Sequence, residues 1–287
     1  AIQAGVLGGE ENKSGRFLYL YSRLAGHLTR LFARIAEEFR QSEFEPAGFE
    51  VPVSEEEGVE PLRLRTPDGR TVLVEGRIDR VDVLEKNGKR YARVVDYKSG
   101  TKAFDLSDVY YGLNMQMLIY LFSIWQDKRS EFAGDTPAGI IYMPAKDTAP
   151  AAECASAADP CSSDAALRFR MNGLLLDDFS VLSAMEPGLA GVYIPVKMKN
   201  NGYDTANLAT LEQFGAIQRH VASVLASMAE ELGAGRIEAL PVARDEKKQC
   251  ERCRFQSVCR MPEDGPCAKL GRLTKKEFFD GIGEDGV

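Results

Sequence analysis

Two runs of residues on either side of a tight-turn signal constrain the fold of this chain more than any other feature. The first run is GRIDRVD at residues 76–82, and the second is VVDYKSG at residues 94–100. Asn87 and Gly88 lie between the runs, and an Asn-Gly pair is typical of the turn that joins two antiparallel strands. The sequence therefore predicts a β-hairpin with one run in each strand.

Acidic and basic side chains occupy matched places on the two predicted strands. Successive side chains point to opposite faces of a strand, so Asp96 and Lys98 project to the same side. Asp79 shares its face with Val81 and Val83, which predicts a row that faces the core. A carboxylate in such a row is costly unless a cation or hydrogen bonds compensate for its burial. The hairpin is therefore a candidate cation site.

These residue types fit the metal-dependent hydrolysis of a phosphodiester bond. Asp79 and Asp96 offer the hard oxygen ligands that suit Mg²⁺ or Mn²⁺, and the backbone carbonyl of Tyr97 offers another. Such a cation neutralises developing charge and lowers the pKa of an attacking water. Lys98, beside the ion, would orient that water or stabilise charge on the phosphoryl oxygens.

A second interpretation treats Asp79, Asp96 and Lys98 as a structural ion-pair set on a solvated hairpin. The hairpin register and the inward side of Asp79 favour the catalytic interpretation. Asp82 shares its face with Arg80, so we expect it either to support the site from outside the ligand set or to lie at the surface.

Hydrophobic periodicity predicts the elements around the hairpin. Helices are expected at residues 16–40, at residues 106–125 and from Thr210 onward. The last of these opens on the capping-box pattern of Thr210–Gln213 and closes at Gly233 or Gly235. Extended segments are expected at Leu62–Arg65, Thr71–Glu75, Ile140–Met143 and Gly191–Val196. Strands flanked by helices predict an α/β fold.

The chain divides into three regions by composition. Residues 1–50 are expected to form an N-terminal helical segment that leads into the core. Residues 51–245 would form the core, with a mobile loop near residues 145–166, where Ala, Ser, Asp and Pro dominate. Residues 246–287 form a cysteine-rich C-terminal segment and a charged tail.

Charge and composition exclude several classes of protein. A formal net charge of −7 argues against a free-standing nucleic-acid binder, so a chain that handles DNA would need a locally basic groove or a partner that supplies one. No apolar run is long enough to span a membrane, and no secretory signal opens the chain. We expect a cytoplasmic protein, without a P-loop motor of its own. Its first residue is Ala1, which suggests a piece of a longer protein.

Six cysteines are present, and four of them lie within a short C-terminal stretch. Disulfides are the less expected use in the absence of an export signal. The spacing of Cys250, Cys253 and Cys259 favours zinc or an iron–sulfur cluster. Cys267 offers a local fourth ligand, which would give a zinc-like site, and free thiols are the third interpretation. Cys154 and Cys161 lie in the predicted loop, as the remaining pair.

The motifs resemble those of a known family. GRIDRVD, the DYK of residues 96–98 and the pair Gln116 and Tyr120, four apart on one helix face, are similar to motifs of the RecB-type nucleases in the PD-(D/E)xK superfamily. The three-cysteine spacing narrows the resemblance to the nuclease domains of AddAB-type bacterial helicase–nucleases. Residues 42–46 and 235–241 extend it over nearly the whole chain. It implies a restriction-endonuclease-like core, with a mixed central sheet flanked by helices.

The resemblance also implies a role for each motif residue. Asp79 and Asp96 would bind the metal, with Lys98 catalytic, and Gln116 and Tyr120 would contact DNA or brace the site. An upstream His in a Gly-x-x-x-His motif often completes such a site. We expect that motif to fall before the first residue of this chain.

Two further ligands are weaker candidates. His27 is the second choice for the histidine ligand, because Gly26-His27 lacks the expected sequence context. Glu50 is an uncertain fourth carboxylate.

The implied cofactors are Mg²⁺ or Mn²⁺ at the hairpin and a 4Fe–4S cluster on Cys250, Cys253 and Cys259. The family takes its fourth cysteine from far upstream, and no cysteine precedes Cys154 here, so the cluster is expected in the full-length protein. The implied function is an exonuclease that cuts unwound single strands of DNA in double-strand break repair and recombination, beside an AddA-like helicase subunit. Alternatives are a stand-alone RecB-like 4Fe–4S exonuclease, a catalytically silent scaffold that guides DNA or docks a helicase, and a zinc-binding interaction module.

Overall fold

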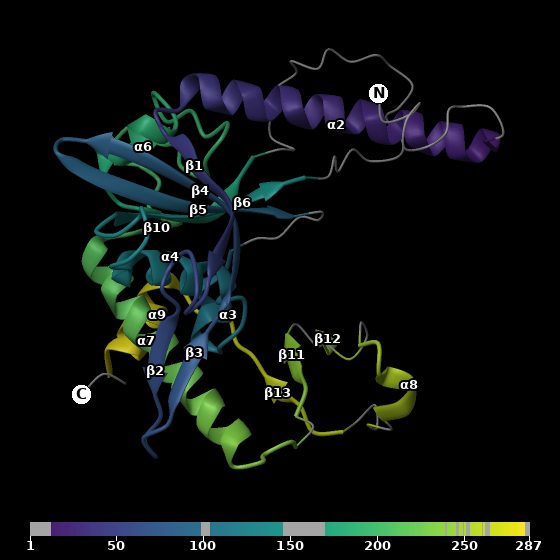
Figure 1. Cartoon of the computed structure of the whole chain (residues 1–287), viewed down its shortest axis with the longest axis vertical. Helices are drawn as coiled ribbons and strands as arrows, with labels where there is room; N and C mark the ends of the chain where they lie inside the picture. Colours follow the sequence, from purple (N-terminus) through teal and green to yellow (C-terminus); the bar gives the residue numbers. More distant parts are fainter. Residues whose placement is uncertain are drawn as a thin grey trace.

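The computed structural model describes residues 13–98, 104–145, 170–238, 240–244, 247–248, 250, 253–259, 261 and 265–284. Among them, six strands form a mixed sheet in the order β1-β4-β5-β6-β7-β10. The strands span Glu45–Val53 (β1), Gly76–Lys86 (β4), Lys89–Lys98 (β5), Thr136–Pro144 (β6), Asn172–Leu176 (β7) and Leu208–Ala209 (β10). The predicted hairpin, β4 and β5, lies inside this sheet with neighbours on both sides (Figure 1).

The turn of the hairpin explains its register. Asn87 and Gly88 have positive φ angles of 54° and 71°, as a tight turn between antiparallel strands requires. Lys86 pairs with Lys89 across the turn, and the ladder continues to Arg80 opposite Val95. The hairpin prediction is confirmed. Strand β6 then adds in parallel to β5, and β7 adds antiparallel to β6.

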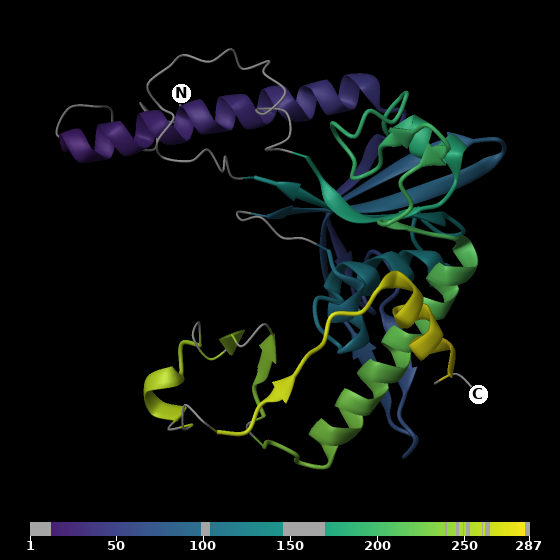
Figure 2. The same ribbon diagram turned by 180° about the vertical axis from the view of Figure 1, so that it is seen from behind.

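Helices lie on both sides of the sheet (Figures 1 and 2). On one side lie α3, α4, α7 and α9, and on the other lie α2 and α6. The helices span Gly15–Gln41 (α2), Leu106–Tyr110 (α3), Gln116–Gln126 (α4), Phe179–Met185 (α6), Leu211–Gly233 (α7), Gln256–Cys259 (α8) and Lys275–Glu284 (α9). The α/β prediction is confirmed. The capping box of Thr210 and Gln213 is present at the start of α7.

Two expected elements are wrong in detail. The single helix predicted at residues 106–125 is broken between α3 and α4, because Gly112 and Asn114 adopt positive φ angles that a right-handed helix excludes. Residues 191–196 form no strand. Instead, the backbone N–H groups of Val192, Tyr193 and Ile194 donate to the buried carboxylate of Glu186 at 2.8, 3.0 and 3.0 Å. One side chain thus takes the place of a partner strand.

The main core lies between the sheet and α4. Strand residues such as Val81, Val94 and Ile140 are fully buried there, as are Leu118 and Leu121 of α4. This packing fixes the hairpin against a helix that the sequence also marks as functional.

The remaining strands are short. β2 (Leu62–Arg65) pairs with β3 (Thr71–Val74), and β8 (Met198–Lys199) pairs with β9 (Gly202–Tyr203). A separate sheet in the cysteine-rich region consists of β11 (Val242–Arg244), β12 (Lys247–Lys248) and β13 (Ala268–Lys269). The loop predicted near residues 145–166 falls, from residue 146 onward, outside the described part of the chain.

Candidate active site

The hairpin brings Asp79, Asp96 and Lys98 together on one face of the sheet. Continuing the ladder beyond Arg80 and Val95 by one residue sets Asp79 opposite Asp96, and alternation puts Lys98 on the same face. Nζ of Lys98 lies 2.9 Å from Oδ1 and 2.6 Å from Oδ2 of Asp96.

The burial of Asp79, Asp96 and Lys98 argues against the interpretation of these residues as a solvated ion-pair set. Asp96 is only 7% exposed, whereas Asp79 and Lys98 are half-buried. The strands that carry them are interior strands of the sheet. A buried carboxylate held by one ammonium, beside a second carboxylate, is a site where desolvation strengthens every charge interaction.

Tyr97 is fixed from both faces of β5. Its backbone N–H donates to Oδ2 of Asp79 at 3.1 Å. On the opposite face, its Oη accepts a hydrogen bond from Nη1 of Arg80 at 2.8 Å. The residue between Asp96 and Lys98 therefore has little freedom to rotate.

A buried group of four charges lies behind the hairpin. Asp82 accepts from Arg80 and from Nε of Arg93 at 2.9 and 2.8 Å, and Nη2 of Arg93 donates to Glu38 of α2 at 2.7 Å. All four side chains are at most 2% exposed. Burial lowers the pKa of Arg93, but Asp82 and Glu38 outweigh it and hold that pKa above its ordinary value. Of the two placements expected for Asp82, the one at the surface is wrong, because two arginines neutralise the carboxylate inside the protein.

Gln116 and Tyr120 brace the start of β4. Nε2 of Gln116 donates to Oη of Tyr120 at 3.2 Å, and the backbone N–H of Arg77 donates to the same hydroxyl at 3.3 Å. Gly76 lies so close to this phenol that an added Cβ would overlap its hydroxyl and ring. The observed contacts are thus those of a brace that holds the strand three residues before Asp79.

Tyr142 of β6 is a site residue that the sequence did not reveal. It pairs with Asp96 in the parallel ladder and is 2% exposed, and Nζ of Lys98 lies 6.0 Å from the centre of its ring. Burial raises the pKa of Tyr142 well above its ordinary value, and Asp96 and Asp108 raise it further. Its strand was predicted, but the pairing of that strand with β5 depends on a crossover that leaves no local signal.

His27 and Glu50 both lie near the hairpin. The ring Nε2 of His27 is 2.6 Å from the carbonyl oxygen of Ala145, and the N–H of Ala145 donates to the carbonyl of Lys98 at 2.7 Å. Glu50 is exposed with a φ angle of 50°, and the pairs that flank it set it across from Asp79. The roles of these two side chains as metal ligands stay predictions.

The donor set fits a hard divalent cation in its chemistry. Asp79 and Asp96 supply carboxylate oxygens and Tyr97 a carbonyl oxygen, which are the ligands Mg²⁺ and Mn²⁺ prefer. Among the described residues, no group of three or more His, Cys, Asp or Glu side chains is arranged to hold a metal.

The C-terminal cysteines are not gathered into a cluster. Cys250 and Cys267 are half-buried, Cys253 and Cys259 are exposed, and none of the four is in a disulfide. The N–H of Cys253 donates to the carbonyl of Cys250 at 3.0 Å. Cys154 and Cys161 lie outside the described residues.

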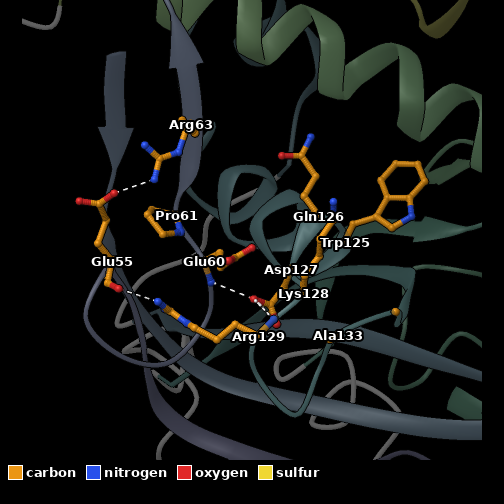
Figure 3. Close-up of a pocket in the computed structure, with 11 residues that line it drawn as sticks. Glu55, Glu60, Pro61, Arg63, Trp125, Gln126, Asp127, Lys128, Arg129 and Ala133 are labelled. Atoms are coloured by element: carbon orange, nitrogen blue, oxygen red, sulfur yellow. Dashed lines mark hydrogen bonds and ion pairs between the residues drawn. The ribbon is translucent and has the colours of Figure 1, made fainter.

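A large open cavity is lined by side chains from residues 55–63 and 125–134, and by none from the hairpin (Figure 3). Its volume is about 810 Å³, and its lining includes Trp125, Lys128 and Arg63. Two arginines of the rim bind a carboxylate or the backbone. Arg63 pairs with Glu55 at 2.6 Å, and Arg129 donates to the carbonyl groups of residues 54, 55 and 58. These contacts tie the end of α4 to the loop after β1, which indicates a structural role.

Comparison with known proteins assigns the family. Residues 5–260 match the PD-(D/E)XK nuclease superfamily. This chain belongs to that superfamily, and the expected fold is confirmed.

The curated relatives narrow the resemblance, and each is the AddB subunit of an ATP-dependent helicase/deoxyribonuclease. The chain is 34% identical over 253 residues to the AddB of Clostridium acetobutylicum. This alignment covers 87% of the chain and 22% of that protein. The AddB of Caldanaerobacter subterraneus subsp. tengcongensis is 32% identical over 283 residues. That alignment covers 95% of this chain and 24% of that protein. The AddB of Ruminiclostridium cellulolyticum is 34% identical over 281 residues, and the alignment covers 96% of this chain and 24% of that protein. The resemblance to AddB is confirmed, and the chain spans about a quarter of the length of these relatives.

Among the helices that the structure describes, none combines the length and the apolar character needed to cross a membrane.

Proposed function

We propose that this chain is a metal-dependent deoxyribonuclease domain that hydrolyses phosphodiester bonds in unwound single strands of DNA. The observation that carries the proposal is the grouping of Asp79, Asp96 and Lys98 on one face of an interior hairpin, with Lys98 in contact with both oxygens of Asp96. Membership of a nuclease superfamily supports it.

Each site residue has a distinct task. Asp79, Asp96 and the carbonyl of Tyr97 would hold Mg²⁺ or Mn²⁺. When bound, the ion supplies positive charge to the phosphoryl oxygens and lowers the pKa of water. Lys98 stabilises negative charge on the phosphate, because its ammonium is anchored by Asp96 and only part of it reaches solvent. Gln116 and Tyr120 hold the strand in place.

The names of the relatives support a proposal about the wider assembly. Their name describes part of an ATP-dependent helicase and deoxyribonuclease. We propose that this chain likewise acts beside an AddA-like helicase subunit, which would deliver unwound ends during double-strand break repair and recombination. In the full-length protein, Cys250, Cys253 and Cys259 would hold a 4Fe–4S cluster together with a cysteine from upstream of this chain, since thiolates are the ligands such clusters use. Iron and sulfide analysis of the anaerobically prepared full-length protein tests that assignment.

The function is tested by incubating labelled single-stranded DNA with the chain and Mn²⁺ or Mg²⁺. Three proteins are compared: the parent, Lys98→Ala and Lys86→Ala. Lys86 is a matched control because it lies on the same hairpin at its turn end, paired with Glu43 at 2.8 Å. We expect cleavage by the parent and by Lys86→Ala, and a loss of at least a hundredfold in Lys98→Ala.

Two results would contradict the proposal. Equal cleavage by the parent and Lys98→Ala would place the activity elsewhere or in a contaminant. A parent that binds DNA and Mn²⁺ without cutting, over a range of substrates, would favour the silent scaffold.

A further inference from the structure

Helix α2 is locally basic in a chain that is acidic overall. Residues 13–36 contain four arginines and a lysine but no Asp or Glu, whereas the whole chain has a net charge of −7. An excess of positive charge confined to one helix is the electrostatic footprint of a polyanion-binding surface. An acidic chain that handles DNA needs a locally basic region, and α2 provides one.

The cations of α2 form a row. Arg16, Arg23 and Arg30 are seven residues apart, which is close to two helical turns and places them on one side of the helix. Arg16 and Arg23 are exposed. His27, four residues after Arg23, belongs to the same row.

The row leads to the candidate active site. His27 contacts the carbonyl of Ala145, whose N–H is bonded to the carbonyl of Lys98. Figures 1 and 2 show α2 passing over the end of the sheet where β5 and β6 finish, with its N-terminal half extending beyond the sheet. A strand of DNA lying along this half of the helix would therefore pass the end of β5, where Lys98 lies on the opposite face of the sheet.

Two exposed aromatic side chains lie beside these cations. Phe17 and Tyr19 are 36% and 61% exposed. The guanidinium of Arg23 lies 5.8 Å from the ring centre of Tyr19, and the ammonium of Lys13 lies 5.5 Å from that of Phe17. Proteins that hold single strands without reading their sequence combine cations for the backbone with aromatic rings on which bases stack.

We propose that the N-terminal half of α2 binds single-stranded DNA and guides it to Asp79, Asp96 and Lys98. The guiding role rests on the proposed nuclease function, whereas the binding of DNA by α2 does not. The exposed leucines of the same helix would also suit a protein partner, but a protein groove gives no reason for four cations over residues 13–30 without a single carboxylate. Arg34, the next cation, is held inside the protein by the carbonyl of Val192 and by Glu37.

The test measures the fluorescence anisotropy of a labelled oligothymidylate with EDTA present, so that no cleavage occurs. The triple variant Arg16→Ala/Tyr19→Ala/Arg23→Ala removes two cations and one ring, all exposed. We expect binding at least tenfold weaker. Two lost phosphate contacts should also reduce the slope of log K against log salt by roughly 1.4, because each contact to a single strand contributes about 0.7.

The control variant is Arg65→Ala/Lys276→Ala/Tyr91→Phe, whose two cations are exposed on β2 and α9, away from α2. It makes the same change in net charge, and we expect it to bind as the parent does. Circular dichroism of each variant confirms that the helices are retained.

Each outcome has a clear meaning. Equal binding by the triple variant and the parent overturns the inference, as does a parent that binds no oligothymidylate. If the parent self-associates in sedimentation, and the triple variant loses only that property, then α2 is a protein interface and the inference is wrong. If α2 binds DNA as expected but no metal supports cleavage, the proposed nuclease function fails while the DNA-binding role of α2 stands.

Discussion

Tyr97 donates its backbone N–H to the carboxylate of Asp79 at 3.1 Å. The bond joins the two strands at the level of the candidate metal site and uses one carboxylate oxygen, which leaves the other for a ligand. Because the phenol of Tyr97 is held by Arg80 on the opposite face, the backbone between Asp96 and Lys98 is fixed at two points. The orientation of the site therefore depends on groups that never meet the DNA.

Tyr97→Phe tests this dependence. The substitution keeps the ring but leaves a buried N–H of Arg80 without its acceptor, which costs about 1–3 kcal/mol of stability. We expect kcat on single-stranded DNA to fall about tenfold with little change in KM, because the ring faces away from the substrate side. The matched control is Tyr91→Phe, on the same strand and the same face. A change in KM alone would contradict a positioning role.

Arg93→Met should be among the most destabilising substitutions on the hairpin. It leaves Asp82 and Glu38 buried with one cation between them, and breaking such a buried set typically costs about 3–5 kcal/mol. Urea denaturation followed by circular dichroism measures the loss. Lys86→Met removes an exposed pair with Glu43 and should cost less than about 1 kcal/mol. Similar losses in the two variants would show that the buried charges contribute no more than a surface pair.

Gly76→Ala should damage both stability and activity. The added Cβ would overlap the hydroxyl and ring of Tyr120, and overpacking of this kind costs about 1–3 kcal/mol. Displacement of the phenol also removes its hydrogen bond from Arg77, so we expect lower kcat at temperatures where the variant is still folded. Gly283→Ala in α9, where a Cβ meets nothing within 4 Å, is the control. Normal activity in a destabilised Gly76→Ala would separate Tyr120 from catalysis.

Asp135 makes the stability of the protein depend on pH. Burial raises its pKa to about 6, against the lowering effect of Arg90 at 3.2 Å. Because the folded state holds the proton more tightly than the unfolded state, this group stabilises the fold fully below about pH 4. That contribution is lost as the pH rises through about 6.

Asp135→Asn removes the titration. We expect the free energy of unfolding of the variant, relative to the parent, to rise by at most about 2 kcal/mol between pH 4 and pH 7. Urea unfolding at several pH values measures it. Asp204→Asn should show the opposite trend, and mainly below about pH 4, because Lys199 lowers the pKa of Asp204 beneath its ordinary value. A relative stability of Asp135→Asn that does not change with pH would contradict the prediction.

Local rules were sufficient to predict the heart of the site. The Asn87–Gly88 turn and the alternation of side chains place Asp79, Asp96 and Lys98 on one face, and the structure has them there. Gln116 and Tyr120 could be assigned to one helix face for the same reason. Their contact with Gly76 and Arg77 could not, because it depends on how α4 packs against the sheet.

Long-range partners explain what the sequence did not reveal. Glu38 and Arg93 are 55 residues apart, so nothing near Asp82 signals that a helix and two strands will bury it among four charges. Tyr142 reaches Asp96 only through the parallel pairing of β6 with β5. In each case the missing information is which elements become neighbours.

The alternation of β5 has a consequence for how the domain tolerates change. Asp96 and Lys98 face one side of the strand, while Arg93 and Tyr97 face the other. A shift of β5 by one residue against β4, which an insertion that the turn cannot absorb would cause, would exchange the two sets. The carboxylate and ammonium would then enter the space that four buried charges now fill, and the arginine would turn toward the substrate. The length of a two-residue turn therefore determines which side chains of β5 face the substrate.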